Sequence, residues 1–108
     1  MKEEFLRAID NKLKVKVTFN AKEKNKGQIT RICIPFDFGP AQKTDAIDKS
    51  AKYHLWDLTS PDPKGSHNLS LNSDQIAHLE VLDENFDPAD YIKWQPKWIY
   101  KRDWGNYS

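Results

Sequence analysis

The sequence is poor in the residues on which several classes of protein depend. Cys33 is the single cysteine among 108 residues, so an intrachain disulfide and a cysteine-based zinc site are both excluded. With four glycines, the chain has neither a glycine-rich phosphate loop nor a Gly-x-Ser-x-Gly nucleophile motif. No apolar run approaches the roughly 20 residues of a transmembrane helix. The N-terminus carries charges among its apolar residues, unlike a signal peptide, so we expect a cytoplasmic protein.

An excess of one charge is also absent. Seventeen Lys and Arg residues against 16 Asp and Glu residues give a net charge of +1. The bulk basic balance typical of nucleic-acid-binding domains is therefore missing. The charges are unevenly distributed, because residues 1–26 carry a net +4, residues 61–90 a net −6 and residues 91–108 a net +3. A local basic face remains compatible with the neutral total.

Hydrophobic periodicity predicts one helix followed by strands. Phe5, Ile9 and Leu13 recur at helical spacing, which indicates an amphipathic helix over residues 3–13. Over residues 14–19, every second residue is apolar, as in a strand with one buried face. The apolar residues are Val15, Val17 and Phe19.

Four further short strands are expected, separated by turn-forming residues. In chain order, they are predicted at Ile29–Pro35, Tyr53–Leu58, Asn68–Leu71 and Ile76–Leu82. Proline cannot donate to a strand ladder, so Pro35 is expected to end its strand. A hairpin loop is predicted over residues 20–27, an irregular segment over 36–52 and turns over 60–65 and 72–74. This spacing favours a mainly β, five-stranded small barrel of the SH3-like type, which leaves no exposed edges.

Aromatic and basic residues alternate in an unusual C-terminal stretch. Residues 91–107 contain three of the four tryptophans, interleaved with four Lys and Arg residues. One interpretation is that this extension packs on the barrel and completes a small core. The other is that it binds nucleic acid or a protein partner, by stacking bases or forming a hot spot. The residues predicted for that second role are Lys14, Lys16, Trp98, Tyr100, Lys101, Arg102 and Trp104.

No catalytic constellation is recognisable. The serines, histidines and aspartates show no ordered triad, and the three histidines show no metal-ligand spacing. We therefore predict no enzymatic activity, no metal and no cofactor. Arg31 is the most distinctive single residue, since its strand position also suits apolar residues. It is expected either to pair with an acid, such as Asp57 or Glu80, or to be presented to an anion.

Several short motifs resemble the WYL domain, a bacterial Sm-like small β-barrel. They are Arg31 and Pro35 in one strand, Tyr53-His54-Leu55 in a central strand, Leu69-x-Leu71, and the ending 82–88. The resemblance covers about residues 3–88. It implies an Sm-like barrel domain over residues 1–90. Residues 91–108 are expected, from their aromatic composition, to form an extension packed on this barrel.

The resemblance implies a regulatory module that binds a small, nucleotide-like ligand or nucleic acid. Transferred by position, the ligand-binding residues would be Arg31, Tyr53, His54, His67 and Gln75. The arginines usual near the fourth strand of the family are missing here, and Tyr-His-Leu replaces Trp-Tyr-Leu. The alternative is a protein-interaction or self-association module that uses the aromatic extension or a barrel edge, with a partner protein or a second copy.

Overall fold

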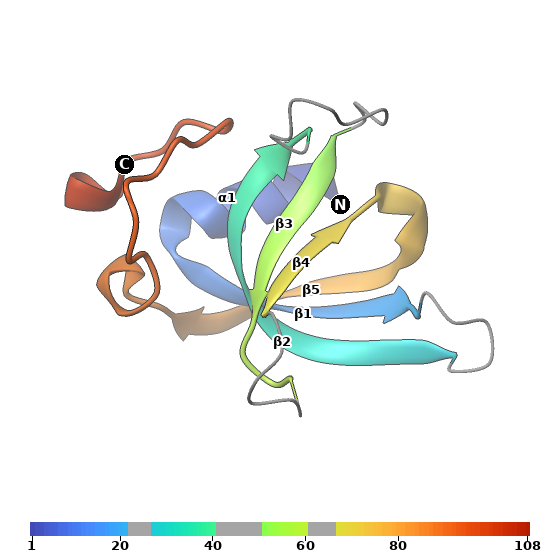
Figure 1. The fold of residues 1–108 in the computed structure, drawn as a ribbon. Coiled ribbons are helices and arrows are strands. Elements are labelled where there is room, and N and C mark those ends of the chain that lie inside the picture. Colours follow the sequence, from blue (N-terminus) through green and yellow to red (C-terminus); the bar gives the residue numbers. More distant parts are fainter. Residues whose placement is uncertain (22–26, 41–50, 61–66) are drawn as a thin grey trace.

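The computed structural model describes residues 1–21, 27–40, 51–60 and 67–108. One N-terminal helix, α1, precedes five strands in a single antiparallel sheet (Figure 1), in the order β4-β3-β2-β1-β5. The elements are α1 (Lys2–Asn11), β1 (Leu13–Asn20), β2 (Gln28–Gly39), β3 (Lys52–Asp57), β4 (Asn68–Leu71) and β5 (Ile76–Asn85). The predicted helix and five-stranded, mainly β fold are thus confirmed.

Helix α1 ends two residues earlier than its apolar spacing predicts. Lys12 adopts a left-handed conformation with φ of 56°, and its backbone N–H donates to the carbonyls of Ala8 and Ile9. This cap reverses the chain, so Leu13 is already the first residue of β1. The helix buries Phe5, Ala8 and Ile9 against the sheet.

Pro35 does not end its strand, contrary to the sequence prediction. β2 runs on to Gly39, and Pro35 lies opposite Leu55 of β3. The register shifts between Pro35 and Asp37, which marks a β-bulge at the position where the proline cannot donate. Residues 36–39 of the predicted irregular segment are therefore strand, whereas residues 41–50 lie outside the described residues. Most of the hairpin loop predicted over 20–27 and of the turn predicted over 60–65 also lies outside them.

A second irregularity changes which residues of β5 face the core. Strict alternation predicts that Ala77 points inward with Leu79, but Ala77 is exposed and Ile76 is buried. Thr18 of β1 pairs with His78, and the next residue pairs with Ile76, so Ala77 is an extra, bulged residue.

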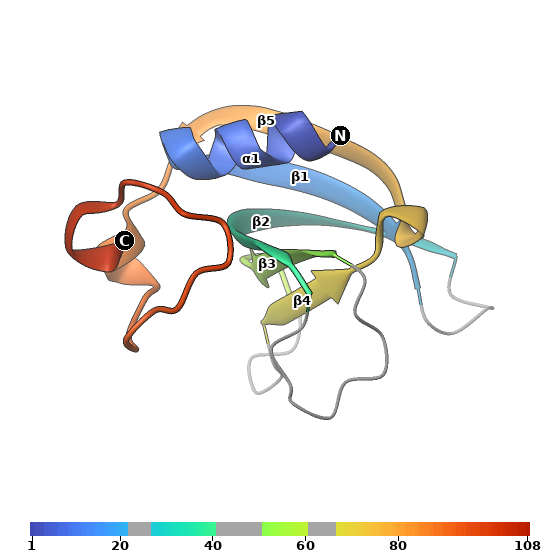
Figure 2. The same cartoon turned by 90° about the horizontal axis from the view of Figure 1, so that it is seen from above.

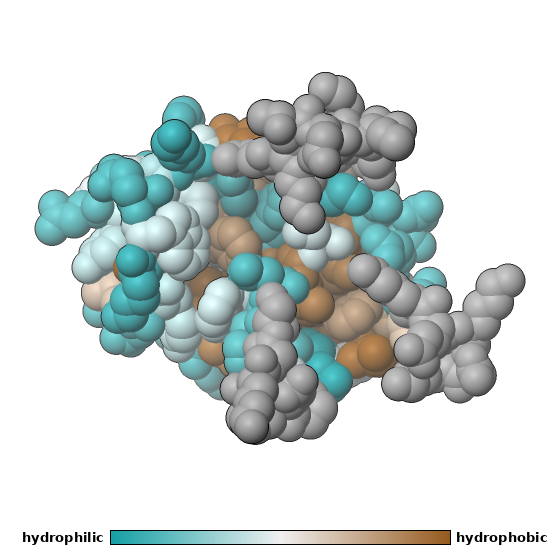
Figure 3. Space-filling view, viewed as in Figure 1, coloured by the Kyte–Doolittle hydropathy of each residue, from teal (hydrophilic) through white to brown (hydrophobic). Residues whose placement is uncertain are grey.

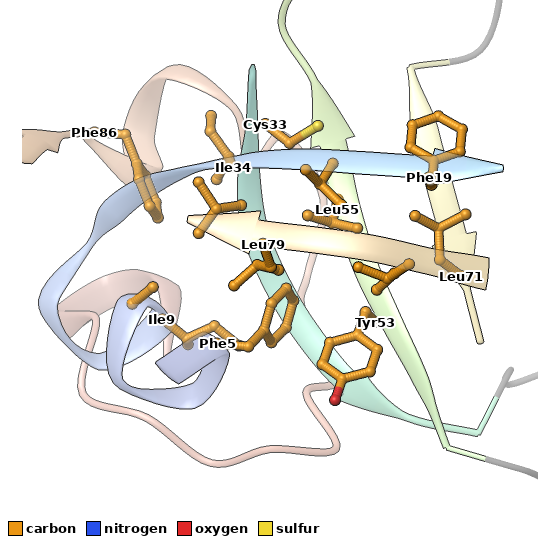
Figure 4. Close-up of a cluster of buried hydrophobic side chains, with 14 of the residues drawn as sticks. Phe5, Ile9, Phe19, Cys33, Ile34, Tyr53, Leu55, Leu71, Leu79 and Phe86 are labelled. Carbon is orange, nitrogen blue, oxygen red and sulfur yellow. The ribbon is translucent and has the colours of Figure 1, made fainter. Parts of the chain in front are cut away.

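The sheet is bent, and the bend places its two halves on either side of the core (Figure 2). Strands β1 and β5 lie against α1, whereas β3 and β4 form the other half. Figure 4 shows Phe5 of the helix reaching towards Tyr53 and Leu79 between these layers. In the described residues, β4 and β5 are the two edges and do not pair with each other, so the sheet is not closed into a barrel.

Cys33 lies in this core, as a small buried residue. Its side chain is fully buried, and its register partners are Val15 on β1 and Asp57 on β3. Burial, and next the negative charge of Asp57, raise the pKa of the Cys33 thiol far above its ordinary value. The thiol therefore stays protonated in the folded chain and behaves as an apolar group.

Two glycines with positive φ provide a test of whether the C-terminal extension packs against β2. A Cβ at Gly39, where φ is +151°, would lie 2.6 Å from Cγ2 of Ile99, whereas a Cβ at Gly27, where φ is +64°, would meet nothing within 4 Å. We expect Gly27→Ala to cost about 1–2 kcal/mol in the free energy of unfolding, from conformational strain alone. Gly39→Ala should cost clearly more in urea unfolding, because Ile99 must also move. Equal losses for the two variants would contradict this packing.

Candidate functional site

A buried carboxylate at the β2 bulge holds the C-terminal extension. Asp37 is 5% exposed and lies in strand β2 between two phenylalanines. Its Oδ2 accepts the backbone N–H of Ile99 at 3.0 Å, and its Oδ1 accepts that of Tyr100 at 3.0 Å. The Oδ1 atom also accepts the N–H of Phe38 at 2.9 Å. A single side chain of the sheet therefore satisfies two backbone donors of the extension.

Arg102 is the cationic partner of this carboxylate. Its side chain is 0% exposed, and its Nη2 lies 3.2 Å from Oδ1 of Asp37. The guanidinium also donates to the carbonyls of Tyr100 and Phe36. Burial is the main cause that lowers the pKa of Arg102, to about 10, and the charge of Asp37 opposes this shift. The group therefore remains charged at neutral pH.

Two tryptophan rings enclose the guanidinium. Its central carbon lies 4.2 Å from the ring centroid of Trp98 and 4.5 Å from that of Trp104. The rings themselves meet edge to face at 5.6 Å. Such contacts combine cation–π attraction with exclusion of water, which strengthens the ion pair inside them.

One indole and one phenol of the extension are hydrogen-bonded to helix α1. Nε1 of Trp104 donates to the carbonyl of Ile9 at 2.8 Å. The hydroxyl of Tyr100 donates to Asp10 at 2.7 Å, and this bond is the first cause of a raised pKa for that phenol. Ile9 and Asp10 belong to the last turn of α1, which lies beside the extension in Figures 1 and 2.

These contacts decide how the predicted nucleic-acid or partner-binding residues are placed. Trp98 and Trp104 are 7% and 3% exposed, so their faces are occupied by Arg102 and by each other. Lys14 lies 3.3 Å from Glu84, while Lys16 on β1 and Lys101 in the extension are exposed. Trp98, Arg102 and Trp104 therefore build an internal cluster, whereas Trp94 of the same stretch is exposed.

A second arginine–aspartate pair lies in a hollow of about 330 Å³ between β4 and the adjoining ends of β1 and β2. Nε of Arg31 lies 3.2 Å from Oδ2 of Asp57, and the Arg31 side chain is 26% exposed. The other carboxylate oxygen of Asp57 accepts the backbone N–H of Thr59 at 2.8 Å. The pairing of Arg31 with Asp57, expected from the sequence as one alternative, is present, yet the guanidinium still reaches solvent.

The hollow is lined by apolar side chains together with several polar and charged ones. Phe19, Ile29, Leu69 and Leu71 provide apolar surface, and Gln75 reaches the rim from the turn between β4 and β5. Figure 3 shows hydrophobic side chains gathered in the centre of the face formed by β2, β3 and β4. Concave apolar surface with a small number of placed polar groups is typical of a small-molecule site.

Of the five predicted ligand-binding residues, Arg31 and Gln75 come together in this hollow, and the other three do not line it. Tyr53 is 4% exposed and packs between the rings of Phe5 and Phe38, at 4.9 and 5.0 Å. Burial raises the pKa of its phenol. Tyr53 is thus a core residue in this structure.

The two predicted histidines make separate local contacts. His54 points to the opposite face of β3 from Tyr53, and its Nε2 donates to the carbonyl of Gly39 at 2.8 Å. His67 donates from Nδ1 to the carbonyl of Asp57 at 2.9 Å and stacks on Trp56. Both rings therefore fix the strand ends around β3.

Asp37 is the important residue that the sequence analysis did not identify. Its signal is the triplet Phe36-Asp37-Phe38, an acid between two aromatics directly after Pro35. Such an acid in an apolar segment is expected to be buried and paired. Because the sequence predicts an irregular segment over residues 36–52, Asp37 is expected to be solvated there, and a solvated carboxylate needs no buried partner.

Comparison of the chain with known proteins identifies no related protein. The chain matches no family model, no curated protein and no solved structure. Within the described residues, no group of three or more His, Cys, Asp or Glu side chains is placed to hold a metal ion. A search of the same residues finds no helix with the length and apolar character needed to cross a membrane.

The buried pair can be tested by removing one charge. Asp37→Asn keeps the size of the side chain but leaves the Arg102 guanidinium buried without its counter-charge. We expect the variant to lose about 3–5 kcal/mol in the free energy of unfolding, measured by urea titration with tryptophan fluorescence. Asp103→Asn, at an exposed position of the same extension, is the matched control and should change little. Similar small losses for both variants would show that the pair does not hold the extension.

Proposed function

We propose that the chain is a non-enzymatic regulatory module of the WYL type, with an Sm-like small-barrel fold, that binds a small nucleotide-like ligand in the Arg31 hollow. The observation that carries the proposal is the partly exposed guanidinium of Arg31, held by Asp57 inside a concave, mostly apolar surface. A preorganised arginine of this kind can present a planar set of N–H donors to a ligand without first being ordered.

The course of the sheet supports the small-barrel part of the proposal. The bent β2 strand contributes to both halves of the sheet, and the three-residue turn η1 (Ser73–Gln75) joins the edge strands β4 and β5. A turn this short brings the two edges together at one end. The Arg31 hollow lies on the same side of the fold, since it is lined by Leu71, which ends β4, and by Gln75, the last residue of that turn.

The electrostatics of the hollow favour a particular kind of nucleotide-like ligand. Asp57 neutralises the charge of Arg31, so the site offers donors and acceptors with no net charge from the pair. A phosphate-rich ligand would prefer several unpaired cations. A planar heteroaromatic group, such as the base of a nucleoside, matches the apolar walls together with the Arg31 N–H groups and the Gln75 amide. We therefore expect nucleosides and mononucleotides to bind better than triphosphates.

Nucleic acid is the less favoured ligand, because Trp98 and Trp104 of the extension are buried. Single-strand binding surfaces need exposed aromatic faces beside a basic groove. Trp98, Arg102 and Trp104 form an internal cluster instead. The small-ligand form of the proposal requires no change in that cluster.

Ligand binding can be tested with nucleosides, mononucleotides, triphosphates and short oligonucleotides, by calorimetric titration at low salt. Arg31→Lys keeps a positive charge beside Asp57 but removes the planar fork of donors. We expect this variant to bind at least about tenfold more weakly than the wild type, which corresponds to one lost charge-assisted hydrogen bond. Arg31→Ala should bind more weakly still, and urea unfolding will separate this effect from any loss of stability caused by an unpaired Asp57.

Lys93→Ala is the control for removing a cation. Lys93 is exposed in the extension and bonds only a nearby carbonyl, that of Ala89, among the contacts described. This variant should bind like the wild type. The proposal fails if no compound shows saturable binding, or if Arg31→Lys and Lys93→Ala have the same affinity. A preference for oligonucleotides that survives both substitutions would instead support a nucleic-acid site elsewhere on the chain.

A further inference from the structure

The outer edge of β5 has no partner within the described part of the chain. β5 pairs with β1 on one side, whereas β4, the other edge of the sheet, is only four residues long. Native edge strands are usually kept from pairing by shortness, by charged residues such as lysine, by proline or by a β-bulge. β5 is ten residues long, contains neither lysine nor proline, and has its first bulge at Ala77. The segment that follows this bulge is therefore available for pairing with another strand.

The charges on this edge are arranged so that it complements itself. His78 and Glu80 are exposed and lie two residues apart on one face of β5, on either side of the buried Leu79. In an antiparallel pair of two β5 strands centred on Leu79, His78 of each copy lies directly opposite Glu80 of the other. The imidazole can donate an N–H to the carboxylate, and such cross-strand pairs of base and acid are favourable.

The neighbouring registers lack this complementarity. Residues directly opposite each other must share a face, so the register can change only by moving the centre to His78 or to Glu80. Centring on Glu80 places two carboxylates opposite each other, which is unfavourable. Centring on His78 places the two imidazoles opposite each other and leaves Glu80 without a basic partner, because the Ala77 bulge turns Ile76 to the other face. Charge therefore selects the register centred on Leu79.

A hollow beside the edge provides room for the side chains of a partner. It measures about 920 Å³ and lies between α1 and β5. Leu13 contributes apolar surface, while Glu4 and Arg7 place both signs of charge on its helix side. A two-fold axis through the centre of the strand pair would bring the same mixed surface from both copies to this place.

We propose that the β5 edge is a homodimer interface, in which two copies pair antiparallel about Leu79 and form one continuous sheet. The partner is a second copy of this chain, because the charge pattern His78-Leu79-Glu80 complements itself. The inference is independent of the Arg31 hollow, which lies between β4 and the ends of β1 and β2. Failure of either proposal leaves the other standing.

The test measures mass in solution by analytical ultracentrifugation across micromolar concentrations. The wild-type chain should show a monomer–dimer equilibrium. His78→Glu places a carboxylate opposite Glu80 twice in each dimer, and we expect it to raise the dimer Kd at least about tenfold. The double variant H78E/E80K restores opposite charges and should recover dimerisation. Because Glu80 also faces Lys16 of β1, urea unfolding must show that this variant is folded.

Gln28→Glu is the matched control, since it adds one carboxylate at an exposed position of β2, away from the edge. It should dimerise like the wild type. A wild-type chain that stays monomeric overturns the proposal. The candidate partner of the β5 edge would then be an extended segment of another protein. A dimer that His78→Glu and Gln28→Glu weaken equally overturns it as well.

Cross-linking tests the register directly. Residues opposite each other in an antiparallel pair lie within disulfide range, whereas diagonal neighbours are about 7–8 Å apart. Oxidation of a mixture of His78→Cys and Glu80→Cys chains should therefore yield the mixed dimer preferentially. The buried Cys33 thiol stays unreactive because its pKa is raised. Preferential linking of His78→Cys to itself would overturn the register centred on Leu79.

Discussion

The ion pair between Arg102 and Asp37 is the interaction on which the arrangement of the C-terminal extension depends. Two charges with almost no exposure to solvent are costly to bury, and only mutual contact with additional hydrogen bonds offsets that cost. Here the carboxylate also accepts backbone N–H groups from the extension, and the guanidinium lies between two indole rings. Because each group is unfavourable without the other, the extension has one position relative to β2, and it covers the end of α1 from there.

The bulge after Pro35 makes this arrangement possible. Proline interrupts the ladder, the register to β3 shifts, and the next carboxylate, that of Asp37, is turned towards the extension. The same chemistry occurs a second time, in the pair of Arg31 and Asp57. There the guanidinium is 26% exposed and borders a hollow, so its remaining donors are available to a ligand. Exposure distinguishes Arg102, whose side chain is buried, from Arg31, which we propose as a ligand-binding residue.

The bend of the sheet has a further consequence for interactions. A sheet that remains open has two edges, and each needs a covering or a partner. β4 is short, while β5 is long and carries the self-complementary pair of His78 and Glu80. The proposed ligand site and the proposed dimer interface therefore occupy different parts of the same sheet and share no lining residue.

The sequence by itself determined the helix, the five strands and their order along the chain, because periodicity and turn residues act locally. It also indicated that Arg31 would either pair with an acid or be presented to an anion, and the structure shows the pair with Asp57. Only the tertiary structure decided that β2 continues through Pro35, that Ala77 is bulged outward, and that Tyr53 is core while Gln75 lines the hollow with Arg31. Likewise, the aromatic and basic pattern of residues 91–107 was compatible with both an internal cluster and an exposed binding face. The choice depended on Asp37, a residue more than 60 positions away whose contact with Arg102 is set by the register of two strands and by no local pattern.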